Sequence, residues 1–460
     1  MVKQNMTDII KNIINDNESA DSEKHKELLE IIESSHIVDI AEILEKLTEK
    51  ERKLLYEEMT PDALAELIPE LALEFQEELI LIVDNDKLKK MFGEMADDDI
   101  ADIFGELSER EVKHLMKLLD REEQEEVETL INYDTHTAGG LMTTDFFSVE
   151  SGTKIRDVIA NIKRYGDEAE MVYYVYVTDI ETEKLLGVAS LKDLLINKQE
   201  IVIDRVMKEN IVHVKTDTDQ EEVAELFSKY DLLAVPVLDE EDRVAGIITV
   251  DDIIDVIKEE ATEDIYAMAG LSEEENENSN SIVSAVKIRL PWLMVSFFGE
   301  LFSALIMKKF GGVIAQLVTL SFFVPLIMAM GGNSGSQSSA VMVRKIAMGE
   351  GTFAKLKKYL IKETMAGLFL GAISGIMIGI IVYMVHSMSM EGMELGIIIG
   401  TALFVAVSCA AVFGTFIPLI FDKFNIDPAV ASGPFITTLN DIGGILIYFT
   451  LASVMLKLNS

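Results

Sequence analysis

Five long hydrophobic segments lie in the C-terminal part of the chain. They run through Pro291–Met307, Val313–Met330, Met365–Val385, Leu395–Leu419 and Pro434–Met455. A helix of roughly 20 apolar residues crosses a bilayer. The pattern therefore predicts five membrane-spanning helices.

Residues 1–135 show a helical pattern with no strand signal. A short apolar–acidic unit recurs at Ile40–Leu47, Leu64–Leu71 and Ile100–Leu107. Repeated short helices of this kind stack on their neighbours, because none can bury its apolar face alone. We expect an all-α superhelical N-terminal domain.

Residues 136–258 contain a duplication. The strand-like run Val172–Asp179 leads to Leu186–Leu195, and Leu232–Asp239 leads in the same way to Ala245–Ile254. Each copy predicts strand, turn, strand and a helix. The duplication resembles a tandem pair of CBS domains, which are α/β regulatory modules that often bind adenine nucleotides. A helix over residues 250–269 and an acidic linker over 272–280 follow it.

Charge divides the chain into two parts. Residues 1–290 hold 30 basic and 72 acidic residues, whereas residues 291–460 hold 10 basic and 8 acidic ones. So acidic a region has no basic surface for phosphate, which excludes nucleic acid as a partner. The single cysteine, Cys409, excludes a disulfide within the chain. The first 30 residues lack the apolar core of a signal peptide, so we expect a cytoplasmic N-terminus.

Basic residues predict the orientation of the spans. With five spans, the basic residues that fall on the same side of the membrane as the N-terminal region are Lys287, Arg289, Arg344, Lys345, Lys355, Lys357, Lys358, Lys362 and Lys423. The opposite side holds only Lys308, Lys309 and Lys457. By the positive-inside rule the N-terminal region is cytoplasmic and the C-terminus lies outside. Because five spans rarely enclose a pore alone, we expect a homodimer with the pore between its subunits.

Asp441 lies within the fifth span. A carboxylate at bilayer depth costs about 2.5–3.5 kcal/mol and by default marks an ion or proton pathway. The neighbouring candidates for lining that pathway are Gly433, Pro434, Thr437, Thr438 and Asn440 in the fifth span and Asn333 after the second. Pro325 is predicted to interrupt the second span, which runs into the glycine-rich stretch Gly331–Gln337. We expect Gly and Pro at these depths to free backbone carbonyls, although small residues also serve helix packing.

These ligands are all oxygens, which favours magnesium, calcium or manganese over copper or zinc. Magnesium keeps several of its waters and needs only one or two carboxylates, so a sparse site fits it best. Glu300, in the middle of the first span, is a second intramembrane carboxylate. Its sequence context favours a structural and a functional role equally.

The whole arrangement resembles the MgtE family of magnesium channels. The residues that carry the resemblance are Ala261–Asp264, Arg289–Trp292, Pro325–Gln337 and Ala431–Asp441. It implies an N-terminal domain over 1–135, CBS domains over 136–200 and 201–258, a connecting helix and linker over 259–288, and a membrane domain over 289–460. It also implies a homodimeric channel that imports Mg²⁺ across the bacterial cytoplasmic membrane, with Asp441 binding the hydrated ion.

The resemblance further implies that cytosolic Mg²⁺ closes the channel by binding carboxylates between the soluble domains. The matching positions are Asp98, Asp102, Asp219, Glu221, Asp231, Asp252, Asp255, Glu260, Glu263 and Asp264. Any pair of these taken alone is typical of a solvated helix face. ATP is a further candidate ligand of the CBS pair, although no residue by itself proves nucleotide binding.

Two other functions remain open at this point: a CBS-regulated carrier of another divalent cation or of protons, with Asp441 as its proton site, and a membrane-anchored nucleotide sensor. An enzyme is disfavoured, because no nucleophile–base constellation is present and the six histidines are scattered. The sequence alone does not show whether the protein selects magnesium over manganese or cobalt.

Overall fold

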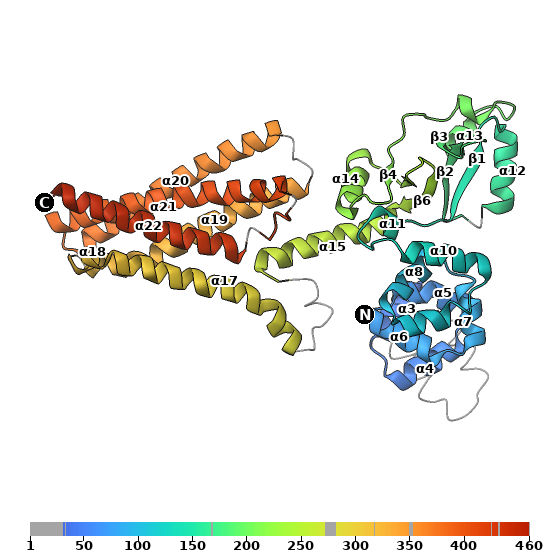
Figure 1. Ribbon diagram of the computed structural model, residues 1–460, viewed down its shortest axis with the longest axis horizontal. Coiled ribbons are helices and arrows are strands. Elements are labelled where there is room, and N and C mark those ends of the chain that lie inside the picture. The colour runs from blue at the N-terminus through green and yellow to red at the C-terminus, as the bar shows by residue number, and fades with distance from the viewer. Residues whose placement is uncertain are drawn as a thin grey trace. The chain divides into compact units, whose positions relative to one another are not determined.

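The computed structural model describes residues 31–32, 34–166, 169–271, 282–316, 318–348, 353–424, 426–430 and 433–459. The chain divides into two compact units, Met1–Val256 and Ile257–Ser460 (Figure 1). The helical character expected for the first 30 residues and the acidic linker expected at 272–280 both lie outside the described residues.

The first unit begins with a stack of short helices. They are α3 (Ile37–Leu44), α4 (Glu49–Glu58), α5 (Pro61–Leu67), the 3-10 turn η1 (Ile68–Glu70), α6 (Leu73–Ile82), α7 (Asn85–Phe92), α8 (Asp97–Glu106), α9 (Glu109–Leu115) and α10 (Arg121–Ile131). The three recurring sequence units correspond to α3, α5 with η1, and α8. Each places fully buried residues in one shared core, among them Leu44, Leu64 and Ile100. The predicted all-α N-terminal domain is confirmed.

Polar residues define where several of these helices begin. Thr48, Ser108 and Asp120 form capping boxes with a glutamate three residues later, and each box satisfies backbone N–H groups that the first turn leaves unpaired. Helix α8 differs, because its N-cap is Ala96, which supplies no side-chain hydrogen bond. Three aspartates fill its first turn instead.

Two similar α/β modules follow. The first has α11 (Ala138–Leu141), β1 (Phe146–Glu150), α12 (Ile155–Tyr165), β2 (Met171–Thr178), β3 (Leu185–Ser190), α13 (Leu191–Ile196) and the 3-10 turn η2 (Ile203–Arg205). The second has β4 (Val214–Lys215), α14 (Gln220–Tyr230), β5 (Ala234–Leu238) and β6 (Val244–Thr249). In each three-stranded sheet the first strand pairs parallel with the second, which pairs antiparallel with the third. The predicted duplication is confirmed.

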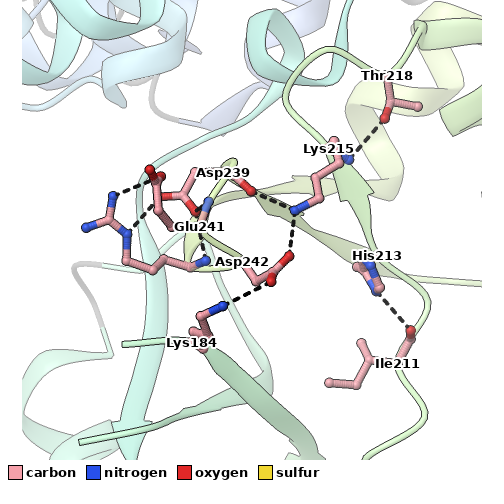
Figure 2. A network of polar contacts seen from close by, with 9 residues as sticks. Lys184, Ile211, His213, Lys215, Thr218, Asp239, Glu241 and Asp242 are labelled. Atoms are coloured by element: carbon pink, nitrogen blue, oxygen red, sulfur yellow. Dashed lines mark hydrogen bonds and ion pairs between the residues drawn. The ribbon is translucent and has the colours of Figure 1, made fainter. Parts of the chain in front are cut away.

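A polar network joins the two modules at their hairpin turns (Figure 2). The Asp242 carboxylate accepts hydrogen bonds from Lys184 Nζ at 3.1 Å and from Lys215 Nζ at 2.8 Å. These two bonds, from opposite modules, hold the pKa of Asp242 below its ordinary value. Lys215 Nζ also donates to the carbonyl of Asp239, and Arg243 donates to the Asp239 carboxylate. Modules of one unit are thus linked by charge as well as by backbone pairing.

Helix α15 (Val250–Ala269) follows β6 directly, with the extent expected for the connecting helix. Its residues up to Val256 belong to the first unit and the rest to the second. One continuous helix therefore belongs to both units.

The second unit contains α17 (Ile282–Lys309), α18 (Gly311–Gln316), the 3-10 turn η3 (Val318–Phe323), α19 (Val324–Ala347), α20 (Phe353–Val385), α21 (Met390–Lys423) and α22 (Pro434–Asn459). Among the described residues, five helices are long and apolar enough to cross a membrane. Five spans were expected, and the predicted five-helix membrane domain is confirmed.

The second span differs from the expectation in its bounds and in its regularity. It was expected over Val313–Met330, whereas the structure places it over Val318–Ala347, with Val313 in the separate helix α18. We expected Pro325 to interrupt it and the stretch from Gly331 to Gln337 to free backbone carbonyls. Instead Pro325 lies in the first turn of α19, where its missing N–H needs no partner, and the glycine-rich stretch is continuous helix. The stretch remains helical because it is packed closely: a Cβ on Gly335 would overlap the Asn440 side chain of α22. Pro434 likewise only begins α22.

Candidate functional site

Asp441 lies two turns into α22, where three helices meet. On α19, a Cβ placed on Gly332 would lie 3.6 Å from Thr437 Cγ2 and 3.8 Å from Asp441 Oδ1. The Ser336 and Thr437 hydroxyl groups are 3.5 Å apart, which gives a polar contact between α19 and α22. On the other side, the Asp441 carboxyl group interacts with the Glu300 carboxyl group of α17. Small and polar side chains therefore surround Asp441.

The candidate lining residues occupy different faces. Asn333 and Thr437 are exposed in the single chain, and Asp441 is partly exposed. Asn440 is only 3% exposed and packs against Gly335, and its two amide atoms have no hydrogen-bond partner among the described residues. Thr438 is half-buried against Gly299 of α17. Gly433 and Pro434 lie at the start of α22, where they contact the end of α15.

That end of α15 belongs to the second unit and lies beside the start of α22 and the end of α19. A Cβ on Gly270 would lie 2.8 Å from Pro434, and one on Gly433 would lie 2.5 Å from the carbonyl oxygen of Met268. Ala267 is buried with Val343 of α19 and Ala429. The connecting helix therefore ends against the N-terminus of the helix that carries Asp441.

Asp264 shares this region with Asp427, in the loop between α21 and α22. Burial and the nearby Asp427 and Glu260 carboxylates raise the pKa of Asp264 to about 6, and Arg344 opposes them. Glu263 adds a smaller effect in the same direction as Glu260. Asp427 was not among the sequence candidates, because no local pattern distinguishes a loop aspartate that becomes important through a distant contact.

A second acidic cluster lies in the first unit and involves all of its domains. Burial and then Asp98, Asp102, Asp252 and Glu170 raise the pKa of Asp99 to about 7. Burial also raises the pKa of Asp98, whose Oδ1 is buried without a hydrogen-bond partner. The carboxylates thus come from α8, from the loop before β2 and from α15.

Other members of this cluster extend it toward α10. Burial and a hydrogen bond with Glu126 raise the pKa of Asp97. Burial, then Asp98 and Glu126, raise that of Asp145 to about 6. Burial raises the pKa of Asp252 to about 6, against an opposing hydrogen bond from Thr249. Asp97, Asp145 and Glu170 were not sequence candidates, since their proximity depends on contacts between domains.

The structure separates the remaining regulatory candidates. Asp219 is the N-cap of α14 and accepts a hydrogen bond from the backbone N–H of Glu221, whereas Asp231 ends the same helix in a left-handed conformation. The two ends of this 11-residue helix lie about 16 Å apart. Glu260 and Glu263 lie on α15 near Asp264 and belong to its cluster, whereas Asp255 lies on the same helix three residues after Asp252. Among the described residues, no three carboxylate, His or Cys side chains are close enough to hold a bare metal ion.

A pocket of about 190 Å³ lies between the two modules of the first unit. Polar side chains contribute much of its wall, together with Val188, Ile211, Val212, Leu232, Ala234 and Pro236. The polar and aromatic ones are Tyr174, Tyr176, Ser190, Asp193, Lys208 and Asn210. Because Tyr176 is only 1% exposed, the wall offers one accessible aromatic side chain, Tyr174, together with the Lys208 cation and several hydrogen-bonding groups.

Known proteins resemble the chain over almost its whole length. The magnesium transporter MgtE of Enterococcus faecalis is 38% identical over 452 residues, which are 96% of each chain. The magnesium transporter MgtE of Bacillus subtilis is 34% identical over 94% of this chain and 95% of its own.

The chain belongs to the MgtE family of magnesium transporters.

Family models agree with this assignment. Residues 324–451 match a model described as a divalent cation transporter, 35–136 the MgtE intracellular N domain, and 138–199 and 202–259 the CBS domain. The crystal structure of the soluble part of a magnesium transporter matches 56% of this chain and 99% of its own, with 32% identity and a TM-score of 0.51. The crystal structure of the cytosolic domain of the Mg²⁺ channel MgtE in complex with ATP matches 49% of this chain and 92% of its own, with 35% identity and a TM-score of 0.48.

The expected family and fold class are therefore confirmed. A membrane protein of this family transports an ion, which also confirms the expectation of a transporter rather than an enzyme. The roles of the individual site residues stay predictions.

Proposed function

We propose that the chain forms a homodimeric channel that imports Mg²⁺ across the bacterial cytoplasmic membrane and closes when Mg²⁺ accumulates inside. The observation that carries the proposal is the position of Asp441. Its carboxyl group lies next to the exposed Thr437 on apolar helices, at a depth where a lone charge is costly. A second subunit covers this polar face and encloses the ion path.

Magnesium suits such a path because it passes with much of its water. The hydroxyl groups of Ser336 and Thr437 and the side chain of Asn333 can bind that water shell, while Asp441 supplies charge. Asn440 is buried against Gly335 and acts in packing. The distribution of Lys and Arg supports a cytoplasmic N-terminus and an external C-terminus.

The acidic cluster of the first unit suits a magnesium sensor. Asp97 is buried, and Asp98, Asp99, Asp145 and Asp252 are partly buried. The buried Asp98 Oδ1 atom has no hydrogen-bond partner among the described residues, and a cation or its water would supply one. No three carboxylates converge among the described residues, so an ion there retains water and bridges pairs. Without Mg²⁺ the carboxylates repel, and the N-terminal domain separates from the CBS pair. With Mg²⁺ the compact arrangement is favoured, since ions bind that state better.

Helix α15 connects this sensor to the gate. Asp252 lies in the sensor at its beginning, and Asp264 lies near Asp427 at its end. A cation between Asp264 and Asp427 would fix the end of α15 against the start of α22. The closed channel is the state in which both contacts are made.

ATP is the candidate ligand of the pocket between the CBS modules. The partly exposed Tyr174 offers a face for an adenine ring, and Lys208 offers a charge for phosphate. The pocket, at about 190 Å³, accommodates part of a nucleotide rather than all of it. The phosphates would therefore extend beyond it into solvent.

The alternative is a proton-coupled carrier in which the paired carboxyl groups of Asp441 and Glu300 exchange a proton. Purified full-length protein in liposomes distinguishes the two. A channel conducts Mg²⁺ along its own gradient with no pH change inside the vesicle. A carrier moves protons with each ion, so an imposed pH gradient would drive Mg²⁺ against its gradient, and that result would overturn the channel proposal.

A further inference from the structure

We propose that Glu300 is a second ion-binding carboxylate of the pore, acting together with Asp441. The inference rests on the proposed function, because it takes Asp441 to line the ion path. In a symmetric dimer the site would then hold four carboxylates, two from each subunit.

Close packing of α17 on α22 places Glu300 at this position. A Cβ on Gly299 would overlap the Thr438 side chain, so only glycine allows the two helices to approach this closely. Glu300 is the next residue, and its carboxyl group reaches that of Asp441. Glycine at position 299 therefore allows the Glu300 carboxyl group to reach that of Asp441.

Exposure shows which way the pair faces. Glu300 is exposed in the single chain, and only 11% of the apolar window of α17 is buried in it. A glutamate that faces hydrocarbon is energetically costly, and intramembrane carboxylates almost always face a bundle interior or a water-filled cavity. Since Asp441 lies on the same side, one polar path between two subunits accommodates both.

A second polar group on α17 lies on the same side of the helix. Ser303 follows Glu300 by three residues and Gly299 by four, which places all three on one face. Ser303 is 2% exposed, and its hydroxyl has no hydrogen-bond partner among the described residues. The buried Ser303 lies one turn after Gly299, which meets Thr438, so its hydroxyl lies within the contact of α17 with α22, and the exposed Glu300 lies at the edge of that contact. The face of α17 that meets α22 thus carries polar groups besides Glu300.

Two neighbouring carboxylates at low dielectric repel unless a cation or a shared proton lies between them. A divalent ion balances both charges at once, whereas a monovalent ion leaves one unbalanced. The pair therefore favours Mg²⁺ over Na⁺ and K⁺, and it strengthens binding without direct coordination, since each carboxylate can accept hydrogen bonds from the waters of the ion.

The test compares Mg²⁺ flux in liposomes containing full-length wild type, Glu300→Gln, Glu300→Asp and the control Glu391→Gln, with Asp441→Asn alongside. Glu391 is exposed in the first turn of α21. We expect Glu300→Gln to raise the half-saturating Mg²⁺ concentration at least about tenfold, which requires only about 1.4 kcal/mol of binding free energy. Glu300→Asp should restore part of this affinity, and Glu391→Gln should match wild type.

The half-saturating concentration separates ion binding from folding, because loss of folded channels lowers the maximal flux alone. A Glu300→Gln channel with wild-type half-saturation and wild-type preference for Mg²⁺ over Na⁺ would overturn the role of Glu300. If the flux of Glu300→Gln is too small to measure, equilibrium Mg²⁺ binding by the purified protein decides in the same way. Retained flux in Asp441→Asn would instead overturn the proposed pore itself.

Discussion

Neutralising Asp99 should stabilise the compact arrangement of the soluble unit in the absence of magnesium. The pKa of Asp99 is about 7, against an ordinary value of 3.8, because Asp99 is buried and lies near Asp98, Asp102 and Asp252. One pKa unit corresponds to 1.36 kcal/mol, so ionising this carboxyl costs at most about 4 kcal/mol more in the compact arrangement than in water. The substitution Asp99→Asn keeps the shape of the side chain and removes that cost.

The sign of the pH dependence follows from the raised pKa. The compact arrangement holds its proton more tightly than the separated one does. The contribution of Asp99 to the stability of the compact arrangement is therefore full below about pH 4 and falls as the pH rises through about 7, and above that pH this contribution no longer changes. Magnesium replaces the missing proton, so its stabilising effect should be large near pH 8 and small near pH 5.

The assay is limited proteolysis of the full-length protein in detergent, with chelator or with Mg²⁺, at about pH 5 and about pH 8. In chelator, wild type should be cleaved slowly at the lower pH and quickly at the higher one, and Mg²⁺ should slow the cleavage only at the higher one. Asp99→Asn should be cleaved more slowly than wild type at the higher pH, and the pH dependence that remains should come from Asp97, Asp145 and Asp252. The control is Asp86→Asn, an exposed first-turn aspartate of α7. If Asp99→Asn retained the wild-type pH profile, or if Asp86→Asn changed it equally, the reasoning would fail.

Two further variants test the membrane unit. Gly335→Ala should destabilise the packing of α19 by about 1–3 kcal/mol, because its methyl group would overlap Asn440; thermal unfolding in detergent measures this, and Gly311→Ala, with open space around it, should not lose stability. Asp264→Asn should raise the Mg²⁺ concentration that closes the channel severalfold without changing open-state flux, because it removes one of the carboxylates near Asp427. Closure at the wild-type concentration would contradict that role.

Much of the fold was predictable because its signals are local. The repeated units around Leu44, Leu64 and Ile100 each contribute to one core. The duplicated strand pairs have the same pairing pattern, and α15 covers Val250–Ala269 as expected. The number of membrane spans followed from the length of the apolar segments alone. In all these cases a short stretch of sequence determines its own structure.

The errors and omissions arise where distant contacts decide. The Gly331–Gln337 stretch has the composition of a break, yet packing of Gly335 against Asn440 keeps it helical. Asp97 and Asp427 have no local signature, because each becomes unusual only beside carboxylates from other elements. Glu300 was visible as an intramembrane charge, but its partner was not, since Asp441 lies more than a hundred residues away.

The most direct test of a magnesium pore gated from the cytoplasmic side is Mg²⁺ flux through oriented liposomes, wild type against Asp441→Ala, at low and high Mg²⁺ on the side of the soluble domains. Wild type should conduct at low Mg²⁺ and close at high Mg²⁺, and Asp441→Ala should conduct at neither. Undiminished flux through Asp441→Ala would contradict the proposed pore. Wild-type flux that is equal at both Mg²⁺ concentrations would contradict its gating.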